Sequence, residues 1–202
     1  MTAYMLEQQL KQQFKHKFTV HQYHQIAETG IFSSSDRVEL IDGEIIKMSP
    51  VGRKHAACVA RLNALFQGKF IGQALVWVQN PIRLNDDSEP QPDLALLLPR
   101  QDFYESDLPT AKDILLVVEV SDSTIAYDRT VKSSIYAEAG ISEMWLLDLN
   151  EQAIEAYSQP STRSYKRMQR YEQNDTFSIL AFPDLNFVWT DMFANSFDRP
   201  NV

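Results

Sequence analysis

An acidic residue inside an apolar run most restricts how this chain can fold. Glu119 interrupts residues 114–120, which are otherwise apolar and predict a strand covered on both faces. Asp93 leads directly into a second apolar run, residues 94–98. A buried ionised carboxylate without a partner is so costly that it must be neutral, paired or bound to a cation. Two such acids at neighbouring strand ends therefore indicate a site for a hard divalent metal.

Length and composition predict one globular domain. The chain has 202 residues, of which 44% are hydrophobic, enough for one substantial core. We expect an N-terminal arm at residues 1–18 and a single domain at residues 19–195. The single cysteine, Cys58, excludes an intrachain disulfide and fits a reducing compartment. No secretory signal or apolar stretch of membrane-spanning length is visible, so the expected location is cytoplasmic, without membrane contact.

The acidic balance of the chain argues mildly against a nucleic-acid partner, because phosphate binding requires cationic surface. The formal net charge is −8 at pH 7. Local patches matter more than the total, and a metal site itself requires acids. Basic residues gather in two groups: Lys47, Arg53, Lys54, Arg61 and Lys69, then Arg163, Lys166, Arg167 and Arg170. Each group is open to two interpretations, a phosphate-binding patch or a solvated face.

Local signals predict most of the secondary structure. A capping box at Thr19 opens a short helix that Gly30 ends. The pair Asp42-Gly43 predicts a hairpin over residues 37–48, because it supplies the positive φ of a tight turn. Apolar spacing predicts helices at residues 52–70 and 128–139 and strands at residues 75–78, 82–84, 93–98, 113–120 and 143–149.

The last part of the chain predicts an antiparallel meander. Its strands are expected at residues 153–157, 164–171 and 177–180, and a short helix capped by Thr190 is expected at residues 190–197. The strand–helix–strand unit at residues 113–149 implies a parallel or mixed sheet with helices packed on it. The predicted fold class is therefore α/β.

A lysine follows the two acids on the next predicted helix. Asp128, Lys132 and Tyr136 are spaced by four residues and therefore share one helix face. A helix packed on the strand that carries Glu119 could bring Lys132 level with Ser121. This amine would supply the cation that orients a water and stabilises the charge of a phosphate in the transition state.

These residues carry a resemblance to a known family. They are Pro92-Asp93, Glu119-Val120-Ser121, Asp128, Lys132, Tyr136, Gly140-Ile141, Glu143, Trp145-Leu146 and Asp148. The pattern resembles the Uma-two family of restriction endonucleases, within the PD-(D/E)xK nuclease superfamily. The resemblance runs from about Thr19 to Trp189 and includes residues 40–44 and His55. The chain departs from the superfamily pattern at Ser121, where a lysine is usual. Members of the family commonly supply that lysine from the following helix, as Lys132 would.

The resemblance implies a restriction-endonuclease-like core, a mixed β-sheet flanked by helices, and Mg²⁺-dependent phosphodiester hydrolysis. Asp93 would be the principal metal ligand; the alternative is a turn-capping aspartate. Glu119 would be the second ligand, aided by the Val120 carbonyl; the alternative is a glutamate paired with a buried cation. Lys132 would orient the attacking water; the alternative is a surface pair with Asp128.

Two further residues are candidates for the same site. Glu44 follows the hairpin turn and could reach the metal directly or through water, although hairpin carboxylates are usually solvent-facing. His55 could contact the scissile phosphate or assist proton transfer. Its alternative is a capping or solvent-facing residue at a helix start. Tyr136 is expected to pack beneath the site.

The leading hypothesis is a metal-dependent endonuclease that hydrolyses DNA with Mg²⁺, for which Mn²⁺ can substitute. A homodimer is expected, because symmetric pairs are the commonest oligomer and suit cleavage of both strands. The alternative is a catalytically inactive module that keeps the nuclease fold and binds a partner or nucleic acid. A weaker alternative is a hydrolase for another phosphorylated metabolite.

Overall fold

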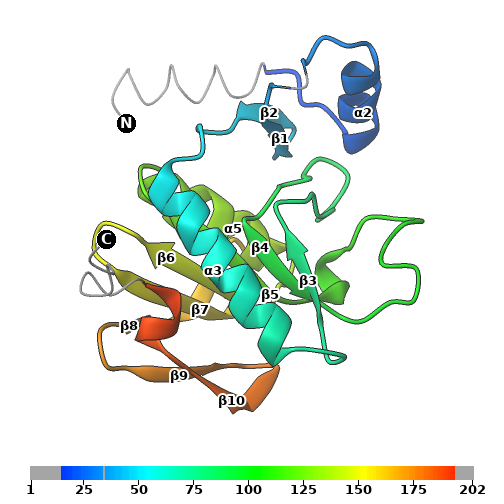
Figure 1. The fold of residues 1–202 in the computed structure, drawn as a ribbon. Coiled ribbons are helices and arrows are strands. Elements are labelled where there is room, and N and C mark those ends of the chain that lie inside the picture. Colours follow the sequence, from blue (N-terminus) through cyan, green and yellow to red (C-terminus); the bar gives the residue numbers. More distant parts are fainter. Residues whose placement is uncertain (1–14, 34, 194–202) are drawn as a thin grey trace, which may run out of the picture.

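A six-stranded mixed sheet forms the centre of the computed structural model, which describes residues 15–33 and 35–193 (Figure 1). Its strands, in spatial order, are β3 (Leu75–Val78), β4 (Leu94–Leu97), β5 (Ile114–Ser121), β6 (Glu143–Asp148), β7 (Ala153–Ser161) and β8 (Ser164–Tyr171). Only β5 and β6 are parallel, and the other neighbours are antiparallel. The predicted α/β class with a mixed, helix-flanked sheet is confirmed. The division into an arm and one domain stays a prediction, and most of the arm lies outside the described residues.

The connection from β5 to β6 is one helical segment. It consists of α4 (Ile125–Tyr127), the π-helical turn η2 (Asp128–Lys132) and α5 (Ser133–Glu138). A parallel pair requires a crossover of this kind, because a tight turn joins only antiparallel neighbours. The crossover carries the polar face predicted for residues 128–136 back over the sheet.

Both faces of the sheet are covered. On one face, α3 (Arg53–Lys69) crosses the sheet, and its Leu62 and Phe66 pack with Trp145 and Val118. On the other face, Tyr136 and its neighbours on α5 pack in a second apolar cluster. Successive strand residues point to opposite faces, so a strand between two such layers is apolar at nearly every position. This arrangement explains why residues 114–120 contain only one charged side chain.

A small hairpin and a helix lie beyond one end of the sheet (Figure 1). The hairpin joins β1 (Val38–Ile41) to β2 (Glu44–Lys47), and the helix is α2 (Val20–Glu28). The turn has the positive φ values predicted for it, 48° at Asp42 and 75° at Gly43. The Glu89 amide donates to the Leu40 carbonyl at 2.8 Å and fixes β1 beside the chain that enters β4. The hairpin is thereby held over the sheet end where Asp93 lies.

Two expectations for strands differ from the structure. Residues 82–84 are not a strand: they make single backbone contacts to Pro90 and Pro109 and one isolated bridge from Arg83 to Thr110. The C-terminal meander divides after β8. Strand β9 (Thr176–Ile179) leaves the main sheet and pairs with β10 (Phe182–Val188), which the sequence did not predict.

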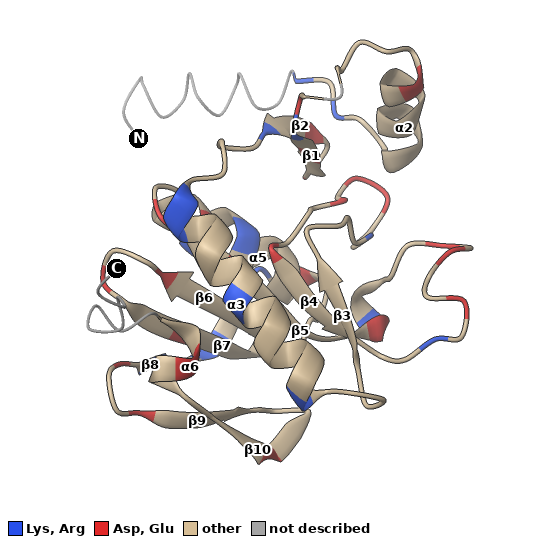
Figure 2. Ribbon diagram, viewed as in Figure 1, with Lys and Arg blue, Asp and Glu red and all other residues tan. Residues whose placement is uncertain are grey.

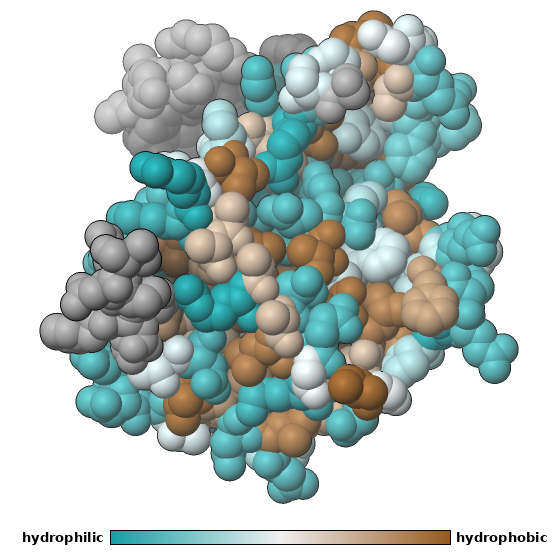
Figure 3. All heavy atoms as spheres, in the orientation of Figure 1, coloured by the Kyte–Doolittle hydropathy of each residue, from teal (hydrophilic) through white to brown (hydrophobic). Residues whose placement is uncertain are grey.

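The closing helix is shorter than expected within the described residues. Helix α6 spans Trp189–Met192 and begins after Val188 rather than at a Thr190 cap. The predicted residues 194–197 lie outside the described part of the chain. On the face drawn in Figure 3, apolar side chains are interspersed with hydrophilic ones. Within residues 15–33 and 35–193, no helix has the length and apolar character needed to cross a membrane.

Candidate active site

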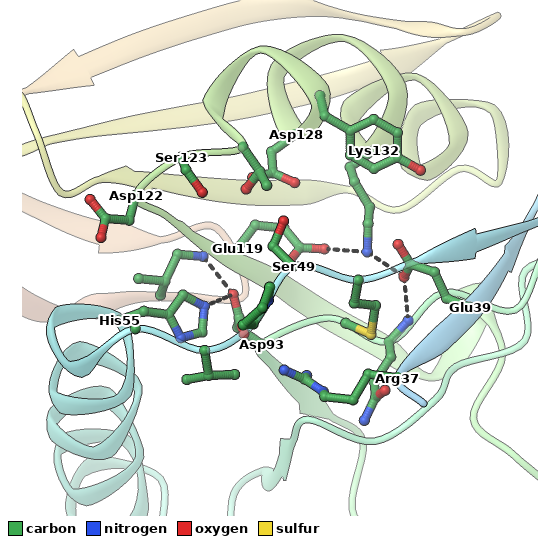
Figure 4. Close-up of a pocket in the computed structure, with 18 of the residues that line it drawn as sticks. Arg37, Glu39, Ser49, His55, Asp93, Glu119, Asp122, Ser123, Asp128 and Lys132 are labelled. Carbon is green, nitrogen blue, oxygen red and sulfur yellow. Dashed lines mark hydrogen bonds and ion pairs between the residues drawn. The ribbon is translucent and has the colours of Figure 1, made fainter. Parts of the chain in front are cut away.

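A cleft of about 360 Å³ lies where the hairpin, the first turn of α3 and the end of β5 meet the helical crossover (Figure 4). Four of the five predicted site residues line it: Asp93, Glu119, Lys132 and His55. They come from four different elements, so only the tertiary fold brings them together. Their contacts define what the cleft can do chemically.

Asp93 lies immediately before β4 and links the start of β4 to the end of β5. Its Oδ2 accepts a hydrogen bond from the Val120 amide at 2.9 Å, which ties it to β5. The same oxygen lies 2.9 Å from Nε2 of His55, and Oδ1 accepts from Nε2 of Gln79 at 3.2 Å. The Asp93 side chain is 11% exposed. It is therefore an oriented, mostly buried carboxylate whose contacts reach β5 and α3, and not the turn-capping aspartate of the alternative.

Glu119 is the buried acid of β5 and points toward the helical crossover. The Tyr136 hydroxyl donates to its Oε1 at 2.6 Å, and the Lys132 ammonium lies 3.3 Å from the same oxygen. Burial raises the pKa of Glu119 to about 8, in spite of the opposing attraction of Lys132. Both contacts use Oε1, and among the described residues none uses Oε2. Glu119 is thus paired with a buried cation, as its alternative anticipated, and it keeps one oxygen for another ligand.

Lys132 lies at the centre of a buried ionic group. Its Nζ donates to Oε2 of Glu39 at 2.7 Å, and the side chains of Lys132 and Glu39 are each 4% exposed. Burial lowers the pKa of Lys132, but attraction by Glu119 and Glu39 outweighs this effect, so the pKa is raised. Lys132 therefore carries a fixed positive charge between two carboxylates. It is not in the surface pair with Asp128 that was the alternative.

Glu39 is a functional candidate that the sequence reasoning missed. It lies on β1, accepts from Lys132, and also accepts from the Gln91 amide at 3.1 Å. The signal was present: Glu39 interrupts the apolar strand Val38–Ile41 just as Glu119 interrupts β5. The turn residues Asp42-Gly43 point instead to Glu44, which directly follows them.

The π-helical turn gives the crossover its local geometry. Lys132 and Asp128 are both buried within this turn, and the Thr124 hydroxyl donates to Oδ2 of Asp128 at 2.7 Å. Burial raises the pKa of Asp128, against the lowering effect of the Thr124 hydrogen bond. Single π-helical turns inside α-helices frequently occur at functional sites. Lys132 and Tyr136, from the face predicted by their spacing, both contact Oε1 of Glu119, whereas Asp128 contacts Thr124.

His55 lies in the first turn of α3 and is held by Asp93. Its hydrogen bond to Asp93 raises its pKa, and this effect exceeds the lowering caused by burial. The other ring nitrogen, Nδ1, is buried and has no hydrogen-bond partner among the described residues. His55 therefore has one nitrogen fixed by Asp93 and the other buried, unlike a solvent-facing helix-start residue.

Glu44 is not brought into the cleft. It follows the hairpin turn, and its carboxylate accepts from the Lys15 ammonium at 3.0 Å on the surface. Its side chain is 32% exposed. Glu44 lies at the turn end of β2, away from the cleft. Ile46 and Met48, which follow on the same face of the hairpin, line the cavity.

The donor set in the cleft fits a hard divalent cation. Mg²⁺ prefers oxygen ligands, keeps several waters and is often held by only one or two protein carboxylates. Asp93 and Glu119 supply two carboxylates, and Oε2 of Glu119 is unengaged by the described residues. Within the described part of the chain, no three His, Cys, Asp or Glu side chains are grouped to enclose a metal by themselves. An open site with water ligands fits this arrangement better than a closed protein cage.

Comparisons with known proteins give a family and a fold for the chain. The model of the Uma2 family, described as "Putative restriction endonuclease", matches residues 20–191. The structure is similar to a crystal structure from Anabaena variabilis titled as a putative nuclease belonging to DUF820. The TM-score is 0.62 at 17% sequence identity, over 82% of this chain and 94% of the other. At this identity the likeness shows the fold alone. No curated protein matches the chain.

Proposed function

Since the chain belongs to the Uma2 family, we propose that it is a Mg²⁺-dependent nuclease that hydrolyses DNA phosphodiester bonds in the cleft of Figure 4. The convergence of Asp93, Glu119 and Lys132 carries the proposal. Two carboxylates and a charged amine, drawn from separate elements, lie within one cavity, with 3.3 Å between Nζ of Lys132 and Oε1 of Glu119.

Each side chain has a role that follows from its contacts. Asp93 and Glu119 would hold a divalent cation, which supplies charge neutralisation and a more acidic bound water. Lys132, kept charged by its carboxylate neighbours, stabilises negative charge that develops on the phosphate and orients the attacking water. His55 holds Asp93 through Nε2 and lines the cleft beside it. Tyr136 is a positioning residue, because its hydroxyl holds Glu119 and does not line the cleft.

The charge around the cleft mouth supports a polyanionic substrate in spite of the acidic total. Arg53 and Lys54 are exposed in the first turn of α3, beside His55, and this end of the helix is blue in Figure 2. Lys47 also lines the cavity from the hairpin. Cationic side chains in this position would neutralise phosphates on either side of the bond being cut. The proposal includes a pair of chains acting on duplex DNA, one site for each strand.

The test is conversion of supercoiled plasmid to nicked or linear forms with Mg²⁺ or Mn²⁺, compared with EDTA. Asp93→Asn keeps the shape of the side chain and should abolish cutting, because an amide is a poor ligand for a hard cation. Glu44→Gln is the matched control, since its carboxylate lies on the surface, and it should cut like the wild type. Undiminished cutting by Asp93→Asn, with the wild-type melting profile, would reject the assignment.

A further inference from the structure

Arg37 faces the cleft from the hairpin. It directly precedes β1, and the Met48 amide donates to its carbonyl at 2.9 Å, so the hairpin ladder extends to this residue. Strand alternation places Arg37 on the same face as Glu39, and Ile46 and Met48 face the same way from β2. All four line the cavity. The direction of the Arg37 side chain is thus set by the strand and does not depend on a flexible loop.

The guanidinium of Arg37 has no hydrogen-bond or ion-pair partner among the described residues. By contrast, the guanidinium groups of seven arginines do donate: Arg61, Arg83, Arg100, Arg129, Arg163, Arg167 and Arg170. Arg37 is partly exposed, so an anion that enters the cleft can reach it. Five donors in a fixed fork are therefore left unused at the wall of the proposed site.

The position of this fork complements that of Lys132. In Figure 4, Arg37 extends below Asp93, on the side of the cleft opposite Lys132. Its charge is close enough to lower the pKa of His55, although the Asp93 hydrogen bond has the larger, raising effect. The ammonium of Lys132 is already engaged with Glu39 and Glu119. Among the described residues that line the cleft, Arg37 and Lys47 are the lysine and arginine side chains without an ion-pair partner, and Arg37 lies on the same face of the hairpin as Glu39.

We infer that Arg37 is a substrate-binding residue that grips the phosphate group at the cleavage point through two of its non-bridging oxygens. This inference rests on the proposed function, because it takes the substrate to be a phosphodiester. An arginine fork matches two phosphate oxygens and fixes their orientation, which an ammonium does not do. Arg37 would hold the phosphate from one side while Lys132 faces it from the other.

The test measures binding of a fluorescent DNA duplex in EDTA, over a series of salt concentrations, for Arg37→Ala and Arg37→Lys. Arg37→Ala should weaken binding about ten- to hundredfold, the value of a charge-assisted contact. It should also make the slope of log K against log salt shallower by about 0.9, equivalent to one phosphate contact. Arg37→Lys should keep the wild-type slope but not the wild-type affinity. A residue that only supported the fold would change the melting temperature and leave the slope unaltered.

One further variant separates a specific grip from general charge. Arg167→Ala removes an exposed arginine on β8 that does not line the cleft, and binding should change less than about threefold. If Arg37→Lys binds like the wild type, or if Arg167→Ala matches Arg37→Ala in both affinity and slope, the inference is overturned.

Failure of the proposed function would be recognised separately. If the wild type binds no duplex, the DNA substrate is wrong, and inorganic phosphate then tests Arg37 by itself. The Nε–Hε resonance of Arg37, assigned by its absence in Arg37→Lys, should shift on phosphate titration in the wild type. An unmoved resonance would reject Arg37 as an anion-binding residue.

Discussion

Replacing Glu119 by glutamine should make the cation-free protein more stable at alkaline pH. Glu119 is buried, and its pKa rises from 4.5 to about 8. Because the folded-state value lies above the unfolded one, the wild type loses stability as pH rises through this window. Glutamine has no such titration. It can still accept from Tyr136, and Lys132 keeps its contact to Glu39.

The expected size follows from the shift. A change in pKa from 4.5 to about 8 corresponds to about 5 kcal/mol, at 1.36 kcal/mol for each pKa unit. The free energy of unfolding of Glu119→Gln, minus that of the wild type, should therefore increase with pH from its value below pH 4.5. The increase should be about 3 kcal/mol at pH 7 and up to about 5 kcal/mol above pH 8. Active sites commonly carry a stability cost of this kind, because a carboxylate is kept ionisable where the fold disfavours charge.

Urea denaturation in EDTA, at intervals from pH 4.5 to pH 9, measures the effect as the difference between the two free energies of unfolding. Glu44→Gln is the control: it removes an exposed carboxylate whose surface pair contributes about 0–1 kcal/mol, so its profile should follow the wild type within that margin. Parallel stability profiles for wild type and Glu119→Gln would refute the conclusion that burial outweighs the stabilising contacts of this acid.

Two other perturbations test the surroundings of the site. Lys132→Met should cost about 3–5 kcal/mol at pH 8, because it leaves two acidic side chains that are at most 6% exposed without their cation. The cost should shrink as the pH falls and Glu119 takes up its proton. A loss below about 1 kcal/mol in urea titration would contradict the ionic group. Gly43→Ala should cost about 1–3 kcal/mol, because its φ is +75° and a Cβ would lie 2.6 Å from that of Lys17. The control is Gly68→Ala within α3, where an added Cβ would have no atom within 4 Å and should stabilise the protein by about 0.5–1 kcal/mol. Equal melting temperatures for the two variants would contradict the assignment of strain to the turn.

The sequence was most informative where local chemistry is decisive. The Thr19 capping box and the Asp42-Gly43 turn were predictable because each depends on only a few adjacent residues. The apolar runs of β5 and β6 were predictable because burial on both faces leaves little choice of residue. The shared face of Lys132 and Tyr136 followed from helical spacing alone, although the π-helical turn between Asp128 and Lys132 did not.

The sequence was least informative where pairing depends on distant segments. Strand β10 contains Pro183, Asp184 and Asn186, shows a register shift, and has no alternating apolar pattern that would predict a strand. Residues 82–84 have strand-like composition, but no neighbouring strand pairs with them beyond one bridge. Glu39 and Glu44 were indistinguishable by residue type. Only the position of the hairpin over the sheet end brings Glu39 to Lys132 and leaves Glu44 beside Lys15.

The account depends most on Asp93 and Glu119 acting together as cation ligands. The direct measurement is a calorimetric titration of Mn²⁺ into the wild type and into Asp93→Asn, at a pH near 8 where Glu119 can ionise. The wild type should show one site for each chain, and Asp93→Asn should lose it while remaining folded. A wild type that binds no cation, or an Asp93→Asn variant that binds it equally well, would contradict the account.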